Sequence, residues 1–226
     1  ESKGVVRIVG VTDPTRTGMG TVAVVWLRAE RGRLTEVVSQ ITALHHAHYV
    51  AYTTGASDIL AIVTLSSKDD LGSIEGLTEV ETSMVLKTCK QAYAWAPWPT
   101  SGSELHPGKV GAWQPDAVDL QIIDYLQRDG RVTFVTIAEA LGITESTVRR
   151  RVTAILDSGI MQVAAIISPA RVGFTTVAMI GIKVERSRLN QVVKELSDMT
   201  CVRYLALSTG KYDLIIEVVQ ESNESL

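Results

Sequence analysis

Apolar residues in the first part of the chain follow strand and helix periodicities in turn. Thr21–Arg28 is apolar and β-branched enough to predict a buried strand. Leu34, Val37, Val38 and Ile41 then have the i, i+3, i+4, i+7 spacing of an amphipathic helix. Two strands joined at Gly55, a short helix and a fourth strand are expected next, over Tyr49–Thr54, Ile59–Leu65, Leu71–Leu77 and Thr82–Thr88. The order βαββαβ resembles a ferredoxin-like sandwich, with helices on one face of an antiparallel sheet.

The chain contains an internal repeat. Thr21-Val22-Ala23 matches Thr176-Val177-Ala178, and Thr54-Gly55-Ala56-Ser57-Asp58 matches Thr209-Gly210-Lys211-Tyr212-Asp213, both at an offset of 155 residues. A second copy of the αβ unit is therefore expected, without an equivalent of Gly72 to about Trp98. Glu1 aligns with Leu156, late in a helix, so we expect the chain to be part of a four-module protein.

The segment between the two copies has a helical pattern. Its first helix has an apolar face of Val118, Ile122, Ile123 and Leu126, and ends at Asp129-Gly130. A second helix is expected over Val135–Leu141, stopped by Gly142, and a third over Glu145–Asp157, with Thr144 as its N-cap and Gly159 after its end. Two short helices joined by Leu141–Thr144 form a helix-turn-helix.

The third helix has the composition of a DNA-recognition helix. Such a helix needs short hydrogen-bonding side chains at its N-terminal end for base edges and cations for phosphates. The predicted DNA-binding residues are Thr144, Glu145, Ser146, Thr147, Arg149, Arg150 and Arg151. The alternative is that the three arginines only form a solvated helix face. Because acidic residues outnumber the arginines of this segment, one copy should bind double-stranded DNA weakly, and either oligomers or the missing first copy of this segment should be required.

The middle segment resembles the DNA-binding domain of Lrp/AsnC transcription regulators. The matching stretches are Asp119–Ile123, Leu126–Arg131, Ile137-Ala138, Leu141–Thr144, Ser146–Val152 and Gly159-Ile160. The flanking repeats are similar to the effector domain of that family, including its Thr-Gly-x-x-Asp turn. The resemblance implies a homo-oligomer, at least a dimer, held together by the αβ domains. Family members usually have one helix-turn-helix followed by one sensor domain, so the duplication is a departure.

The expected fold class is α+β: a winged helix-turn-helix flanked by two ferredoxin-like βαββαβ (RAM-type) domains, of which the second is incomplete. Prolines, glycines and serines from Trp95 to Gly108 mark a linker, whose tryptophans either dock on their own domain or form a partner surface. The expected organisation is residues 1–15 from a preceding wing and connector, 16–98 the first αβ domain, 99–115 the linker, 116–168 the winged helix-turn-helix and 169–226 the second αβ domain.

The resemblance also implies that a small effector, such as an amino acid, binds near the hairpin turns of the αβ domains. The corresponding residues are Thr54, Gly55 and Asp58 in the first copy and Thr209, Gly210 and Asp213 in the second. Turn amides are suited to a carboxylate, and aspartate to an ammonium group. The competing interpretation is structural, because a hairpin turn uses Gly for positive φ and Asp or Thr for local hydrogen bonds. The two turns also differ, with Ala56-Ser57 in place of Lys211-Tyr212.

An enzyme is the main rival interpretation, because siroheme decarboxylases have the same architecture. His45, His46 and His48 form a possible catalytic or metal-binding cluster, but their repeat equivalents are Thr200, Cys201 and Arg203, which favours a solvated loop. Gly18-Met19-Gly20 lacks the dinucleotide-binding pattern. We therefore expect no catalytic residues, no metal and no cofactor apart from the effector. A third reading, an oligomerisation module that has lost DNA binding, conflicts with the intact row Arg149–Arg151.

Composition narrows the protein class further. Apolar residues at 46%, charged residues at 21% and a net charge of −3 fit an ordinary globular protein and argue against a general nucleic-acid coat. Cys89 and Cys201 are far apart and outside metal-ligand spacing, so we interpret both as buried apolar side chains. The sequence shows no membrane-spanning run and no signal peptide in its first residues, which predicts a cytoplasmic protein without a membrane partner.

Overall fold

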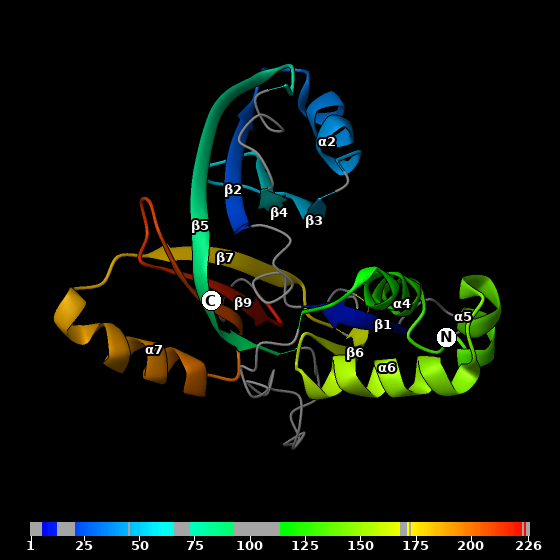
Figure 1. Cartoon of the computed structure of the whole chain (residues 1–226). Helices are drawn as coiled ribbons and strands as arrows, with labels where there is room; N and C mark the ends of the chain where they lie inside the picture. The colour runs from blue at the N-terminus through cyan, green and yellow to red at the C-terminus, as the bar shows by residue number, and fades with distance from the viewer. Residues whose placement is uncertain are drawn as a thin grey trace.

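The computed structural model describes residues 6–12, 21–44, 46–65, 73–92, 114–167, 171, 173–222 and 224. Figure 1 shows an αβ domain with helix α2 at the top, a second with α7 at the lower left, and a helical lobe of α4, α5 and α6 at the right. Within the described ranges, no helix is long and apolar enough to cross a membrane. The predicted linker lies almost wholly outside the described residues.

The first αβ domain is an antiparallel sheet with one helix on its face. Its elements are β2 (Thr21–Ala29), α2 (Leu34–Thr42), β3 (Ala47–Tyr52), β4 (Ile59–Leu65) and β5 (Leu77–Gln91). The strand order β3-β4-β2-β5 is that of a ferredoxin-like sheet. Residues of β2 and β4 that face α2 are fully buried with Val37 and Ile41, whereas neighbouring positions point to the other face.

The helix predicted over Leu71–Leu77 is wrong for the residues that the structure describes. Ser73–Gly76 form a turn, Leu77 already pairs with Ala29 as the first residue of β5, and residues 71–72 lie outside the described ranges. Strand β5 is also much longer than predicted. Its first half pairs with β2 and its second half with the other αβ domain.

The second αβ domain repeats the first. It contains β7 (Thr176–Ile182), the short 3-10 helix η2 (Arg186–Arg188), α7 (Leu189–Asp198), β8 (Val202–Ser208) and β9 (Leu214–Gln220). Strand β5 pairs with β8 from Val85↔Ser208 to Gln91↔Tyr204, so one seven-stranded sheet, β3-β4-β2-β5-β8-β9-β7, runs through both domains. Lys90 on β5 donates to the carbonyls of Ser197 and Met199, both at 2.7 Å, at the end of α7.

The helical lobe contains α4 (Ala117–Arg128), α5 (Phe134–Leu141) and α6 (Glu145–Asp157), followed by β6 (Met161–Ile167). The bounds of α5 and α6 agree with the predicted helices to within one residue, and α4 ends directly before the predicted stop at Asp129-Gly130. Apolar side chains from all three helices form one buried core, which includes Ile122, Ile137, Val148 and Ile155. Strand β1 (Val6–Thr12) pairs antiparallel with β6, and the Gly130 N–H donates to the Ile8 carbonyl.

The repeat seen in the sequence is present in the structure. The first residues of β1, β2, α2, β3 and β4 are each 155 positions before those of β6, β7, α7, β8 and β9. Val9 pairs with Ala164, its own repeat equivalent, so the β1–β6 ribbon has a local pseudo-twofold axis. The α+β fold class, with a helix-turn-helix beside ferredoxin-like domains, is confirmed. The domain boundaries stay a prediction.

Candidate DNA-binding surface and effector turns

The recognition helix α6 is fixed at its N-terminus by hydroxyl groups. Gly142 ends α5 in the left-handed conformation, with φ of +66°. Thr144 then caps α6, because its Oγ1 accepts from the Thr147 N–H at 3.3 Å and lies 3.0 Å from Ser146 Oγ and 2.8 Å from Thr147 Oγ1. Thr144 and Thr147 therefore set the start of the helix.

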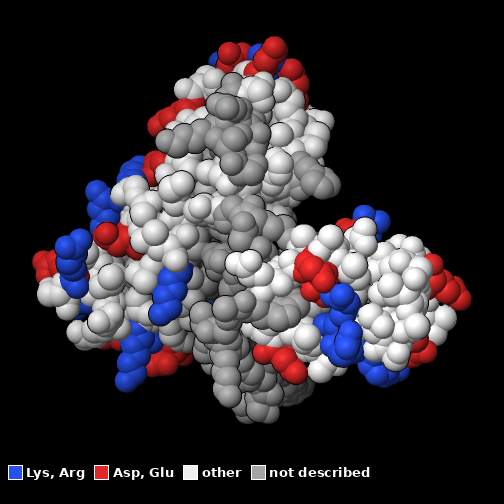
Figure 2. Space-filling view, viewed as in Figure 1, with Lys and Arg blue, Asp and Glu red and all other residues white. Residues whose placement is uncertain are grey.

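One face of α6 is buried and the other is exposed. Val148, Val152 and Ile155 are packed into the core of the lobe. Ser146, Arg149 and Arg150 are exposed on the opposite side. Figure 2 shows basic side chains, with acidic ones beside them, over the lobe that these helices form. The exposed face thus offers short polar groups near the helix start and cations further along.

Arg149 is held by two neighbours that lie close on the surface. Its Nη2 is 2.8 Å from Glu145 Oε1, one helical turn earlier, and its guanidinium lies 5.2 Å from the centre of the Phe134 ring. The Arg149 side chain is still 64% exposed, so this ion pair contributes little stability. The role of Phe134 was missed from the sequence, where it only appears as an apolar residue near the start of α5.

Arg151 has a structural role that the sequence analysis did not predict. Its Nη1 is 2.8 Å from Asp116 Oδ2 and 2.7 Å from Asp119 Oδ1, and the Asp119 side chain is only 5% exposed. Asp116 and Asp119 also form a capping box at the start of α4. The Arg151 guanidinium lowers the pKa of Asp116, after the larger effect of the Asp119 backbone N–H. Arg151 therefore joins α6 to α4, and its guanidinium is bonded to these carboxylates, unlike the exposed side chains of Arg149 and Arg150.

The two effector turns have the same local architecture. Gly55 and Gly210 have φ of +104° and +97°, which favours glycine at both positions. Asp58 Oδ2 accepts from the Ala29 N–H at 3.1 Å, and Asp213 Oδ2 accepts from the Val184 N–H at 2.9 Å. Both aspartates thus have a structural hydrogen bond, although each bonds a backbone N–H 29 residues earlier and not the local turn backbone that the competing interpretation named.

The surroundings of the two turns differ. The second turn packs on β5: the Thr209 N–H donates to the Met84 carbonyl at 2.9 Å, and Lys211 Nζ lies 3.0 Å from Glu81 Oε2. In the first turn, Thr54 is exposed, and a Cβ added at Gly55 would meet no described atom within 4 Å. The first turn is therefore open and the second is in contact with the other domain. Neither Glu81 nor its contact with Lys211 was found from the sequence.

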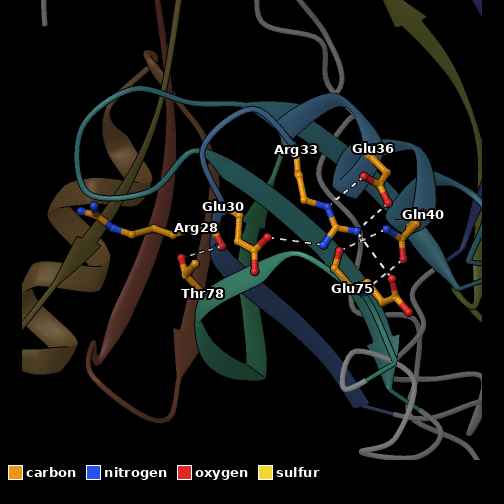
Figure 3. A network of polar contacts seen from close by, with 7 residues as sticks. All are labelled: Arg28, Glu30, Arg33, Glu36, Gln40, Glu75 and Thr78. Carbon is orange, nitrogen blue, oxygen red and sulfur yellow. Dashed lines mark hydrogen bonds and ion pairs between the residues drawn. The ribbon is translucent and has the colours of Figure 1, made fainter.

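A polar cluster on the first αβ domain has a structural role. Arg33 donates to both oxygens of Glu36, at 2.9 and 2.7 Å, and lies 3.4 Å from Glu30 and 3.6 Å from Glu75 (Figure 3). Glu36 and Glu30 raise the pKa of Arg33, with the Glu36 hydrogen bond as the largest cause. Because Gln40 also bonds the Glu75 backbone, the cluster holds the turn before β5 onto α2.

The histidine cluster does not form a site in the described part of the chain. His45 lies outside the described residues. His48 Nε2 is 2.6 Å from Thr64 Oγ1, and burial, with a smaller effect of His46, lowers the pKa of His48. Among the described residues, no three His, Cys, Asp or Glu side chains are grouped so as to hold a metal ion. Cys89 and Cys201 are half-buried against the core of the second αβ domain.

Solved structures confirm this architecture. The structure of the siroheme decarboxylase NirDL aligns with 99% of this chain and 70% of its own length, with a TM-score of 0.70 and 14% identity. Its complex with an iron-uroporphyrin III analogue aligns with a TM-score of 0.68, also at 14% identity. At this identity the likeness shows the fold and carries no activity to this chain.

Sequence comparisons identify the family. Residues 116–154 match the AsnC-type helix-turn-helix domain, and residues 22–95 match the Lrp/AsnC ligand binding domain. An uncharacterised HTH-type transcriptional regulator of Pyrococcus furiosus is 38% identical over 112 residues, 49% of this chain and 76% of the relative. The regulator LrpA of Pyrococcus abyssi is 34% identical over 112 residues, 49% of this chain and 79% of its own length. The chain therefore belongs to the Lrp/AsnC family of helix-turn-helix transcription regulators.

Proposed function

We propose that this chain regulates transcription by placing α6 in the major groove of a specific DNA sequence. One observation carries the proposal: Ser146, Arg149 and Arg150 are exposed on one side of α6, while Val148 and Val152 anchor the other side in the core. A rigid helix with this division of faces suits a helix-turn-helix reader.

The roles of the exposed residues follow from their chemistry. We assign base-edge contacts to Ser146 and Glu145, near the helix start, because a carboxylate accepts from the amino group of cytosine and a hydroxyl bonds any base edge. Arg149 and Arg150 contact phosphates. The Arg149–Glu145 pair is exposed and weak, so exchanging it for a phosphate contact costs little.

Binding requires more than one helix-turn-helix. The net charge is −3, and two exposed arginines on α6 give few phosphate contacts. We infer a homo-oligomer, at least a dimer, assembled through the αβ domains, so that two or more copies of α6 act on one DNA molecule. The symmetry of such an assembly then predicts a DNA site made of two half-sites.

A small effector, such as an amino acid, is proposed to bind at the turns Thr54–Asp58 and Thr209–Asp213. Since both aspartates bond backbone N–H groups, we assign ligand contact mainly to the turn amides and to Thr54 and Thr209. Thermal shift measurements with the twenty amino acids test this step. A ligand that raises the melting temperature of the chain, but not that of a Gly55→Val variant or a Gly210→Val variant, identifies the turn used.

A regulatory rather than catalytic role is proposed because the relatives named above are transcription regulators. Only the likeness of the fold supports the alternative function, a siroheme decarboxylase. Release of carbon dioxide from an added tetrapyrrole would overturn the regulatory assignment. Cytoplasmic location stays a prediction of the sequence.

Fluorescence anisotropy with a labelled duplex, over a series of salt concentrations, tests the DNA-binding surface. We expect Arg149→Ala with Arg150→Ala to lower the slope of log affinity against log salt by about 2 per chain, from roughly 0.9 per phosphate contact. The matched control is Arg186→Ala with Arg188→Ala, two exposed arginines on η2 in the second αβ domain. Equal slopes for both double variants would show that α6 is not the DNA-binding element.

A further inference from the structure

The two αβ domains face each other through an apolar layer. Val22, Val24 and Leu60 from the first domain are buried together with Ala206 and Ile215 from the second. Because both domains derive from one repeat, the residues of this layer on β2, β4, β8 and β9 have equivalents 155 positions away. Most pairs keep their apolar character, and the exceptions show how the two domains have diverged.

Two pairs at one end of this layer have exchanged large and small side chains. Trp26 on β2 corresponds to Gly181 on β7, and Tyr212 corresponds to Ser57. A Cβ added at Gly181 would overlap the Tyr212 ring, so Tyr212 fills the place of a side chain at position 181. The same ring meets Trp26 of the other domain edge to face, with centroids 5.6 Å apart and planes at 62°.

A charge contact has diverged beside this aromatic pair. Glu81 on β5, which pairs with Trp26 across the sheet, bonds Lys211 of the second domain at 3.0 Å. Its second oxygen, Oε1, is buried and has no hydrogen-bond partner among the described residues. The repeat equivalent of Lys211 is Ala56, which offers no charge. Glu81 therefore depends on a cation that only the second copy supplies.

These contacts exist only when a first domain pairs with a second domain. If two first domains paired, Trp26 would face Ser57, and Glu81 would face Ala56 and lose its cation. If two second domains paired, the Trp26–Tyr212 contact would be absent, because the equivalent of Trp26 in the second domain is Gly181. Pairing of two first domains is strongly disfavoured, because the half-buried Glu81 carboxylate would lose its cation. A specific interface needs such a penalty against wrong partners.

We propose that Lys211 and Tyr212 are specificity residues which pair the second αβ domain with a first αβ domain and exclude pairing between like domains. The proposal concerns assembly of the αβ domains and does not depend on DNA binding or on an effector. Its partner is defined chemically: a ferredoxin-like domain with an aromatic residue at position 26 and a carboxylate at position 81.

The first test gives the second copy the residues of the first copy in the full chain, as Lys211→Ala with Tyr212→Ser. The seam between the domains is the pairing of β5 with β8 and the hydrogen bonds beside it. The Thr209 and Ala92 N–H groups donate across this seam to the Met84 and Arg203 carbonyls, so their hydrogen exchange rates measure its stability. We expect these seam amides to exchange at least about tenfold faster while the β2–β4 amides of the first domain are unchanged. We also expect the mass measured by light scattering to exceed that of the wild-type chain at the same protein concentration, as like domains pair between chains.

The matched control is Lys194→Ala with Tyr52→Ser, which makes the same chemical changes at exposed positions away from the seam. The proposal is overturned if seam exchange in the test variant equals that of the control, if all elements exchange faster together, or if the mass of the test variant equals that of the wild type at every protein concentration.

A second test uses the size complementarity directly. Gly181→Trp should lower the melting temperature by at least about 5 °C, because the new side chain collides with Tyr212. Adding Tyr212→Ser recreates the Trp-and-Ser combination of the first copy and should restore most of the loss. A tolerated Gly181→Trp, or a double variant no more stable than the single one, contradicts the proposal.

Discussion

Arg151→Met removes the cation that joins α6 to the start of α4. Arg151 makes two ion pairs of 2.8 and 2.7 Å, and one partner, Asp119, has a side chain only 5% exposed. The variant leaves this carboxylate buried with one remaining hydrogen bond, from the Asp116 N–H at 3.0 Å. Breaking a buried pair from one side costs about 3–5 kcal/mol.

The expected cost here lies at or just below the lower limit of that range. Asp119 keeps its capping bond and the Arg151 side chain is 26% exposed, so the helical lobe should lose about 2–3 kcal/mol, the scale of one charged hydrogen bond. Since 1.4 kcal/mol is a factor of ten, the slowest α6 amides, such as that of Val152, should exchange roughly 30 to 150 times faster.

Native-state hydrogen exchange measures this directly, with Arg150→Met as the matched control. Arg150 is exposed on the same helix, so the identical chemical change there should alter α6 protection by less than about 0.5 kcal/mol. For DNA binding the order should reverse: Arg150→Met should lower the slope of log affinity against log salt, and Arg151→Met should change this slope less. Equal protection in both variants would refute the structural role assigned to Arg151.

Two further predictions concern the αβ domains. Lys90→Met removes both hydrogen bonds to the C-terminal end of α7 and should lower the free energy of unfolding, measured in urea, by about 1.5 kcal/mol. Lys87→Met, at an exposed position of the same strand, should lower it little. Equal losses would contradict the capping role of Lys90. Burial raises the pKa of Glu217 above its ordinary value of 4.5, so its ionisation opposes folding, and stability is lost as pH rises through the raised pKa. The melting temperature of Glu217→Gln should therefore exceed that of the wild type at pH 8 and nearly equal it at pH 4. A difference in melting temperature that does not grow with pH would contradict the raised pKa of Glu217.

The helices of the lobe were predictable because their signals are local. The apolar period and the caps Thr144 and Gly142 lie within the helices or next to them, and α6 begins and ends at the predicted residues. The repeat also located the second αβ domain from the first, since an equal offset implies an equal fold.

Features that depend on distant partners were not predictable. Strand β5 runs on to Gln91 because it pairs with β8, more than a hundred residues later, and no local pattern in Lys87–Gln91 records that partner. The row Arg149–Arg151 looks uniform in the sequence. The carboxylates that bond Arg151 come from a capping box on another helix, 32 and 35 residues earlier.

Selection from a random duplex library is the most direct test of the central claim that α6 reads DNA sequence. The wild-type chain should enrich one motif, repeated with the symmetry of the oligomer, while the chain with Arg149→Ala and Arg150→Ala should enrich none at the same salt concentration and the Arg186→Ala, Arg188→Ala control should enrich the wild-type motif. Enrichment of the same motif by the α6 variant, or of no motif by the wild type, would contradict the account.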